Sequence, residues 1–201
     1  MLIDCFEDTV WKIRPEGFTV KSCYNWLRNK KEDVWWYKII WSNMGAPKHA
    51  FIAWLITNNA LMLKSRLFQL HIAPDNLCCL CQLQEENHAH LFHQCVFSAQ
   101  ILQGVGQWLH SDLTQSDILL KVTRRRWGRL RKSICCDAVF HCWYAVWMQR
   151  NQARINQCIV VPAVVIAQIQ QAIRSRYCLY KSCNVSSKDR AWLIRVQLES
   201  N

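Results

Sequence analysis

Glycine is scarce in this sequence, with five residues among 201, and the glycine-rich loops that hold nucleotide phosphates are missing. This excludes a P-loop or a dinucleotide-binding fingerprint. Long apolar runs are also missing, because Asp137 and His141 interrupt the stretch 134–148, and Pro162 interrupts the shorter stretch 159–167. A membrane-spanning helix needs roughly 18 apolar residues in a row, so none is predicted.

The N-terminus has no basic segment followed by an apolar core, so no secretory signal is predicted. We therefore expect a soluble, intracellular protein, in the nucleus or the cytoplasm. In a reducing compartment the twelve cysteines should be thiols or metal ligands, not disulfides. Eight of them lie mostly among apolar residues and are expected to be buried thiols: Cys5, Cys23, Cys135, Cys136, Cys142, Cys158, Cys178 and Cys183.

Four side chains between residues 78 and 95 have the spacing of a zinc site. Cys78 and Cys81 form a C-x2-C pair, eight residues follow, and His90 and Cys95 form H-x4-C. Three sulfurs and one imidazole would complete a tetrahedral shell with no open position, which predicts one structural Zn²⁺ and no catalysis at the metal.

The ligand assignment leaves alternatives. Cys79 competes with Cys78, and His88 and His93 compete with the second pair. In a regular helix His90 and His93 would share a face, whereas a residue five positions away would point elsewhere. The choice of Cys95 therefore requires His90 near the start of a helix, or an irregular segment.

Acidic residues are few beyond residue 95, where five acidic side chains face fifteen basic ones, so +10 of the net charge of +11 lies there. Seven of the basic residues fall within twelve positions, around one tryptophan. We predict a nucleic-acid contact in which arginines bind phosphate and the indole stacks on a base. The alternative is a solvated face without a partner. The predicted residues are Lys121, Arg124, Arg125, Arg126, Trp127, Arg129, Arg131 and Lys132.

Helical periodicity dominates the sequence. Helices are expected over about 20–29, 35–41, from Pro47 onward, 62–70, 96–109, 117–132, 134–156 and 162–182, with a short hairpin over 9–20. In the helix after Pro47, the inward face should be Phe51, Trp54 and Leu55. In the basic helix, Leu120, Thr123, Trp127, Leu130 and Ile134 should face inward. The prediction is a mainly α fold: a helical domain with a short N-terminal β-hairpin and a small Cys3His zinc-binding loop.

These elements suggest three parts within one continuous domain. They are an N-terminal hairpin and helix at 1–33, a zinc-binding core at 34–110, and basic C-terminal helices at 111–201.

The metal motif and several other segments occur in an order that resembles one family, the zinc-binding domain that follows the reverse transcriptase in plant non-LTR retroelement polyproteins. The resemblance selects Cys95 over His93 as the fourth ligand. One departure is Ile101-Leu102, where the family usually has a tryptophan. The segments are Asp8–Trp11, Gly17–Tyr24, Trp36, Ile40–Trp41, Pro47–Lys48, Phe51–Leu55, Leu77–Cys81, Glu86, His90–Cys95 and Trp147–Asn151.

The catalytic parts of such polyproteins have no counterpart here. Neither a paired aspartate in a hairpin nor a set of spaced carboxylates for nuclease work can be found, and only three acidic residues follow residue 133. The resemblance thus implies a non-enzymatic zinc-binding module that contacts RNA or DNA, with a reverse transcriptase supplied in trans as a second partner. The alternatives are a structural or protein-interaction module and a retroelement remnant without function.

Overall fold

The computed structural model describes residues 34–41, 45–179 and 185–198. The chain divides into two compact units, Met1–Val34 and Trp35–Asn201, and the described helices belong to the second. The hairpin predicted at 9–20 and the helix predicted at 20–29 lie outside the described residues. Within the described ranges the regular structure is helical, as predicted, apart from one isolated antiparallel bridge between Leu77 and Glu85.

The described helices follow the predicted order closely up to residue 109. Pro47 begins a helix, as proline favours at a first helical position, and the same holds for Pro162 further along. A π-helical turn, η1, precedes α6. The elements are α3 (Tyr37–Ile40), α4 (Pro47–Thr57), α5 (Lys64–Gln69), η1 (His90–Gln94), α6 (Val96–Trp108), α7 (Ile118–Arg124), α8 (Arg129–Asn156), α9 (Pro162–Leu179) and α10 (Ser187–Arg195).

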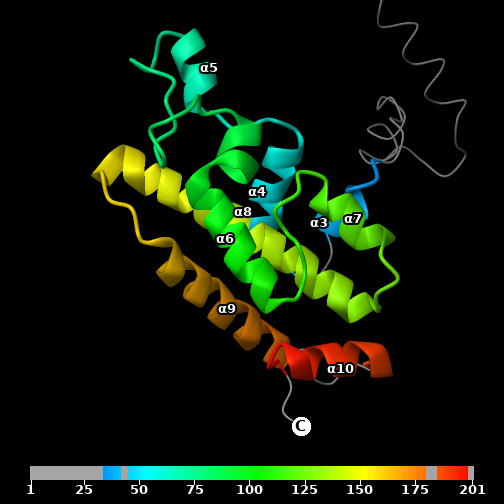
Figure 1. The fold of residues 1–201 in the computed structure, drawn as a ribbon. Coiled ribbons are helices and arrows are strands. Elements are labelled where there is room, and N and C mark those ends of the chain that lie inside the picture. The colour runs from blue at the N-terminus through cyan, green and yellow to red at the C-terminus, as the bar shows by residue number, and fades with distance from the viewer. Residues whose placement is uncertain (1–33, 42–44, 180–184, 199–201) are drawn as a thin grey trace, which may run out of the picture. The chain divides into compact units, whose positions relative to one another are not determined.

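Helix α8 is the centre of this unit, and α4, α6, α7, α9, α10 and η1 all pack against it (Figure 1). Its buried stretch runs without a break from Ile134 to Trp143, as expected for a helix that is apolar nearly all round. Helix α9 returns along α8 and also packs against α6, and its buried residues include Val165, Ile169 and Ile173. Among the described residues, none of the helices is both long enough and apolar enough to cross a membrane.

The single helix predicted over 117–132 is wrong. Helix α7 ends at Arg124, and α8 begins only at Arg129. Arg125 has an extended backbone, and so does Gly128. A Cβ atom at Gly128 would collide with the carboxylate of Asp189 in α10. The break between α7 and α8 therefore lies where Asp189 of α10 packs directly against the backbone.

Two predictions of burial also need correction. In α4 the buried face is formed by His49, Ala50, Ile52, Ala53 and Ile56, whereas Phe51 is half exposed. Because α4 is apolar around most of its circumference, its sequence did not distinguish the two faces.

Of the predicted inward stripe of the basic helix, Ile134 is buried as predicted, whereas Leu120, Thr123, Trp127 and Leu130 are only half-buried. Helix α7 instead buries Ile118, Leu119 and Val122. Of the cysteines expected to be buried thiols, Cys135, Cys136 and Cys142 are buried, but Cys158 and Cys178 are exposed.

Helix α10 was not predicted. Ser186 caps it, and its hydroxyl accepts a hydrogen bond from the Asp189 backbone N–H at 3.2 Å. Two tryptophans tie it to α6: Trp192 donates to the Leu109 carbonyl at 3.1 Å, and Trp108 donates to the Val196 carbonyl at 3.0 Å. A Ser-x-x-Asp pattern at an N-cap was the available signal for this helix.

Candidate metal centre and basic surface

A tight turn brings Cys78 and Cys81 together. The Cys78 backbone N–H donates to the Gln84 carbonyl at 2.8 Å, and the Gln82 N–H donates to the Cys78 carbonyl at 2.9 Å. Gln82 has a positive φ of 56° and so lies in the left-handed region that lets the chain reverse. The two thiols thus sit on one short loop that begins and ends beside the Leu77–Glu85 bridge.

The second pair, His90 and Cys95, is held by the π-helical turn η1. The Cys95 N–H donates to the His90 carbonyl at 2.7 Å, which closes a turn of five residues where an α-helix would use four. A wider turn needs more residues per revolution, so side chains five positions apart come to the same side. This is the irregular segment that the H-x4-C spacing requires.

The four predicted side chains converge. One potential ligand atom from each of Cys78, Cys81, His90 and Cys95 lies within 4.8 Å of all the others. Cys78 Sγ lies 3.9 Å from Cys95 Sγ, and Cys81 Sγ lies 3.3 Å from His90 Nε2. Zinc–ligand bond lengths place the corners of a tetrahedron about 3.8 Å apart for two sulfurs and about 3.6 Å apart for sulfur and nitrogen. The donor set and its spacing therefore fit a zinc ion.

The competing residues do not join this group. Cys79, His88 and His93 are absent from the convergent set within the described part of the chain. The backbone N–H of Cys79 instead donates to Glu86 Oε2 at 3.2 Å, and the His93 ring lies edge-on to Trp143 with 5.8 Å between the ring centroids. These residues have other neighbours, whereas Cys95 is one of the converging side chains.

The electrostatics of the centre favour an anion at Cys95 and a neutral ring at His90, while Cys78 keeps its proton until a metal displaces it. The hydrogen bond from the Cys78 thiol raises the pKa of Cys78 and lowers that of Cys95. Cys95 also lies at the N-cap of α6, where the helix dipole stabilises an anion. Burial lowers the pKa of His90, so its imidazole is neutral at physiological pH, as a ligand must be. Cys78, His90 and Cys95 are buried, which leaves Cys81 as the half-buried member.

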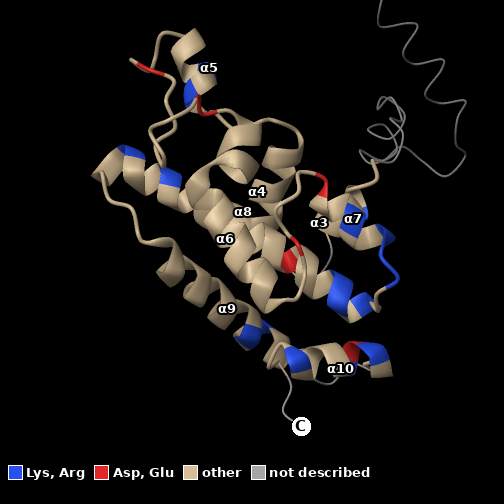
Figure 2. Cartoon of the chain, in the orientation of Figure 1, with Lys and Arg blue, Asp and Glu red and all other residues tan. Residues whose placement is uncertain are grey.

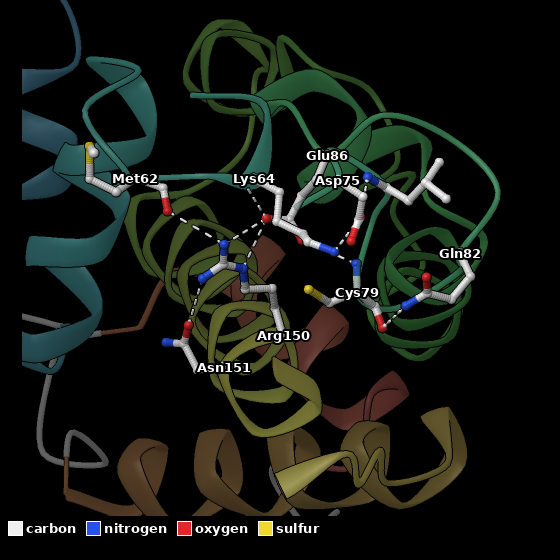
Figure 3. A network of polar contacts seen from close by, with 9 residues as sticks. Met62, Lys64, Asp75, Cys79, Gln82, Glu86, Arg150 and Asn151 are labelled. Atoms are coloured by element: carbon white, nitrogen blue, oxygen red, sulfur yellow. Dashed lines mark hydrogen bonds and ion pairs between the residues drawn. The ribbon is translucent and has the colours of Figure 1, made fainter. Parts of the chain in front are cut away.

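A buried ion pair joins the metal loop to α8. Arg150 is 1% exposed and Glu86 is 0% exposed, and their closest atoms, Nη2 and Oε1, lie 2.7 Å apart. The Arg150 Nε–H donates to the same oxygen at 3.0 Å (Figure 3). Burial by itself raises the pKa of Glu86, but the hydrogen bond and charge of Arg150 and two backbone N–H groups outweigh it and lower the pKa.

The remaining polar atoms around this pair are also satisfied. Glu86 Oε1 accepts from the Lys64 backbone N–H at 2.9 Å, and Arg150 donates to the Met62 carbonyl at 3.4 Å and to the Asn151 side-chain oxygen at 3.0 Å. Figure 3 shows these groups around the guanidinium. Glu86 and Arg150-Asn151 lie in separate segments of the family resemblance, and their contact was not predicted from the sequence.

The structure divides the predicted basic residues into an exposed group and a group whose charges contact other side chains or carbonyls. Arg124, Arg125, Arg126 and Arg129 are exposed along the end of α7, the connection and the start of α8 (Figure 2). The other three basic residues are engaged: Lys121 pairs with Asp117 at 3.1 Å, Lys132 donates to the Thr123 carbonyl at 2.7 Å, and Arg131 packs on Trp127 and Trp192.

Trp127 already has cationic neighbours. The guanidinium of Arg125 lies 4.6 Å from the centroid of its ring and that of Arg131 lies 4.0 Å from it. Such contacts are favourable cation–π interactions. Stacking of Trp127 on a base would therefore have to compete with these guanidinium groups, and a role in orienting Arg125 follows more directly from the contacts.

Helix α10 adds positive charge beside this stretch. Its first turn lies against Gly128, and Lys188 and Arg190, which flank Asp189 in sequence, are exposed (Figure 2). We call Arg124, Arg125, Arg126, Arg129, Lys188 and Arg190 the basic surface. Residues about 60 positions apart contribute to it, which the sequence analysis had no means of detecting.

Comparison with known proteins bears on the metal centre. Residues 18–101 match a family model described as zinc-binding in reverse transcriptase, and this range includes all four converging side chains. No curated protein and no solved structure matches the chain. The family describes a zinc-binding region and not the catalytic reverse transcriptase domain. Residues 18–101 are thus similar to the zinc-binding region associated with reverse transcriptases.

Proposed function

We propose that this protein is a non-enzymatic module, derived from a retroelement polyprotein, that holds one structural Zn²⁺ and contacts RNA or DNA through the basic surface. Cys78, Cys81, His90 and Cys95 are the four zinc ligands. The observation that carries the proposal is their convergence within 4.8 Å, inside a segment that matches a zinc-binding family. Three thiolates and one imidazole leave no position open for a substrate, which supports a structural role.

Zinc in this role would fix the loop on which Glu86 lies and thereby hold it against α8. The turn at Cys78 and the π-helical turn η1 come from different parts of the loop, and the ion would join them. Because the site needs the folded arrangement, the free energy of zinc binding contributes to folding.

Metal analysis of the purified protein tests the zinc part. We expect one tightly bound zinc per chain in the parent and its loss in Cys81→Ser. A matched control is Cys158→Ser, which changes an exposed thiol and should keep the metal. Zinc-free parent protein, or a Cys81→Ser variant with unchanged zinc content and stability, would contradict the assignment.

The nucleic-acid part is supported by the charge distribution. The basic surface gathers six cationic side chains, and the carboxylate between Lys188 and Arg190 is buried against Gly128. Arginine binds phosphate through a planar fork that donates two hydrogen bonds. Such contacts would position the protein on a nucleic-acid backbone without reading its sequence.

The salt dependence of binding to RNA and DNA oligonucleotides tests this part. The logarithm of the affinity should fall linearly with the logarithm of salt concentration, with a slope of about −0.9 for each duplex phosphate neutralised. Arg126→Ala and Arg129→Ala should each make the slope less steep by about that amount. Arg66→Ala, an exposed arginine on α5, is the control and should change nothing. Negligible affinity at low salt, or a flat salt dependence, would leave the zinc domain with a structural or protein-interaction role.

A reverse transcriptase supplied in trans is the protein partner that the family match suggests. Co-purification of the two proteins after nuclease treatment would separate direct contact from contact through nucleic acid.

A further inference from the structure

A second cluster of metal-binding side chains lies between α4 and α8 and shares no residue with the Cys3His group. His49, Asp137 and His141 each offer one ligand atom, and these atoms lie within 4.8 Å of one another. All three residues are buried, with exposed fractions of 5%, 6% and 6%. Charged and polar side chains are rarely buried to this extent without a partner. Their common burial therefore calls for a physical reason.

The hydrogen bonds within the cluster leave ligand atoms unused. His141 Nδ1 lies 2.9 Å from the backbone carbonyl of Asp137, and because a carbonyl oxygen only accepts, this nitrogen carries the proton. In the neutral form that a metal requires, the lone pair of His141 is then on Nε2, in the arrangement by which a backbone carbonyl fixes the tautomer of a metal-binding histidine. His49 Nδ1 is buried and has no hydrogen-bond partner, and Asp137 Oδ1 also makes no hydrogen bond, although His141 Nδ1 lies 3.4 Å and Arg176 Nη1 3.7 Å from it. Unsatisfied buried atoms of this kind indicate a bound water or ion.

The donor atoms of the cluster suit a cation, but Lys48 and Arg176 nearby are positively charged and would weaken its binding. Burial is the main cause that lowers the pKa of His49 to about 3, and the neighbouring cationic groups contribute, so its ring is neutral. An anion would meet this neutral ring and the carboxylate of Asp137. A metal ion would meet two lone pairs and one negative charge, opposed by Arg176, whose Nη1 lies 3.7 Å from Asp137 Oδ1.

A pocket of about 370 Å³ reaches the cluster from the surface. His49, His141, Tyr144 and Arg176 are among the residues that line it. Water can therefore approach the two histidines, and an ion held there would keep open coordination positions, unlike one held by the Cys3His group.

The geometry points to a second metal site, in which His49, Asp137 and His141 bind one divalent transition-metal ion through two nitrogens and one oxygen. Imidazole and carboxylate donors suit Zn²⁺, Co²⁺ and related ions. Because Arg176 lies beside Asp137, the affinity should be lower than at the Cys3His group. The site is independent of the proposed function, since it uses neither the zinc loop nor the basic surface.

Titration of the metal-free full chain with Co²⁺ distinguishes the two sites. Thiolate ligands give an intense charge-transfer band, whereas a site with nitrogen and oxygen donors shows only weak ligand-field bands. We expect the first equivalent of Co²⁺ to produce the charge-transfer band and a second, weaker equivalent to add ligand-field absorption alone. A single equivalent that produces only the charge-transfer band would overturn the second site.

Two substitutions that conserve shape test the ligands, and a third tests the opposing charge. Asp137→Asn and His141→Gln should each lower the affinity for the second Co²⁺ by more than about tenfold. Tenfold is the lower end of what is lost when even an indirect metal contact is removed. His110→Gln, an exposed histidine, should leave it unchanged. Arg176→Gln removes a positive charge and should raise the affinity for the second Co²⁺. Unchanged second-site affinity in all three variants at the cluster would overturn the proposal, and tighter binding in Arg176→Gln would support it even if the other two variants fail to fold.

Discussion

Removal of Arg150 is expected to destabilise the domain strongly, because it leaves the buried carboxylate of Glu86 without its counter-charge. Both side chains are essentially inaccessible to water, and two nitrogens of Arg150 reach the same oxygen at 2.7 and 3.0 Å. Removing one partner of a buried pair costs about 3–5 kcal/mol. Arg150→Met retains an apolar stem of similar length, so the loss reports mainly on charge and hydrogen bonding.

Urea unfolding of the zinc-loaded protein, followed by tryptophan fluorescence, measures this effect. A loss of about 3–5 kcal/mol corresponds to a fall in Tm of about 6–20 °C for a domain of this size. Arg154→Met lies about one turn further along α8, is exposed, and should change the free energy of unfolding by less than about 0.5 kcal/mol. It is therefore the matched control.

A double-mutant cycle with Glu86→Gln completes the test. The double variant has no unpaired buried charge, so it should lose less stability than the two single variants together, with an interaction energy of about 1–3 kcal/mol. If the single effects simply add, or if Arg150→Met resembles Arg154→Met, the pair does not hold the metal loop against α8 and the reasoning fails.

Four other changes have expected outcomes. Chelation of zinc should lower the Tm by calorimetry, and restored zinc should recover it. Gly128→Ala should cost about 1–3 kcal/mol in urea unfolding because its methyl group meets Asp189, whereas Gly104→Ala meets only the movable end of one side chain and should cost less. Ser186→Ala removes the N-cap of α10 and should cost about 1 kcal/mol. Since the folded-state pKa of Glu86 is lowered, its contribution is complete above the unfolded-state pKa and is lost as pH falls through the folded-state value, so stability measured against pH should fall less steeply in Glu86→Gln.

The convergence of Cys78, Cys81, His90 and Cys95 could be predicted because metal geometry constrains sequence spacing directly. Two residues between thiols suit one tight turn, and the loop that follows need only be long enough to return. Helix geometry alone pointed to His93, and family resemblance was needed to choose Cys95. The structure supplies the missing reason, since η1 is a π-helical turn that aligns residues five apart.

The break between α7 and α8 could not be predicted from local propensity. Arg125, Arg126 and Trp127 are all tolerated in helices, and one glycine is a weak interruption. The break becomes understandable only when α10 is in place, because Asp189 lies against Gly128 and Trp192 contacts Arg131. Tertiary contacts with a helix about 60 residues away therefore override the periodicity of the basic stretch.

Three polar residues are buried on α8, the central helix of the domain: Asp137, His141 and Arg150. In the sequence analysis Asp137 and His141 served only to argue against a membrane helix. A polar side chain in such a position is costly unless another element supplies a partner. Arg150 finds Glu86 on the metal loop, and the other two find His49 on α4 and Arg176 on α9. Buried polar residues on a central helix therefore indicate where that helix takes part in a site, although the identity of the partners requires the fold.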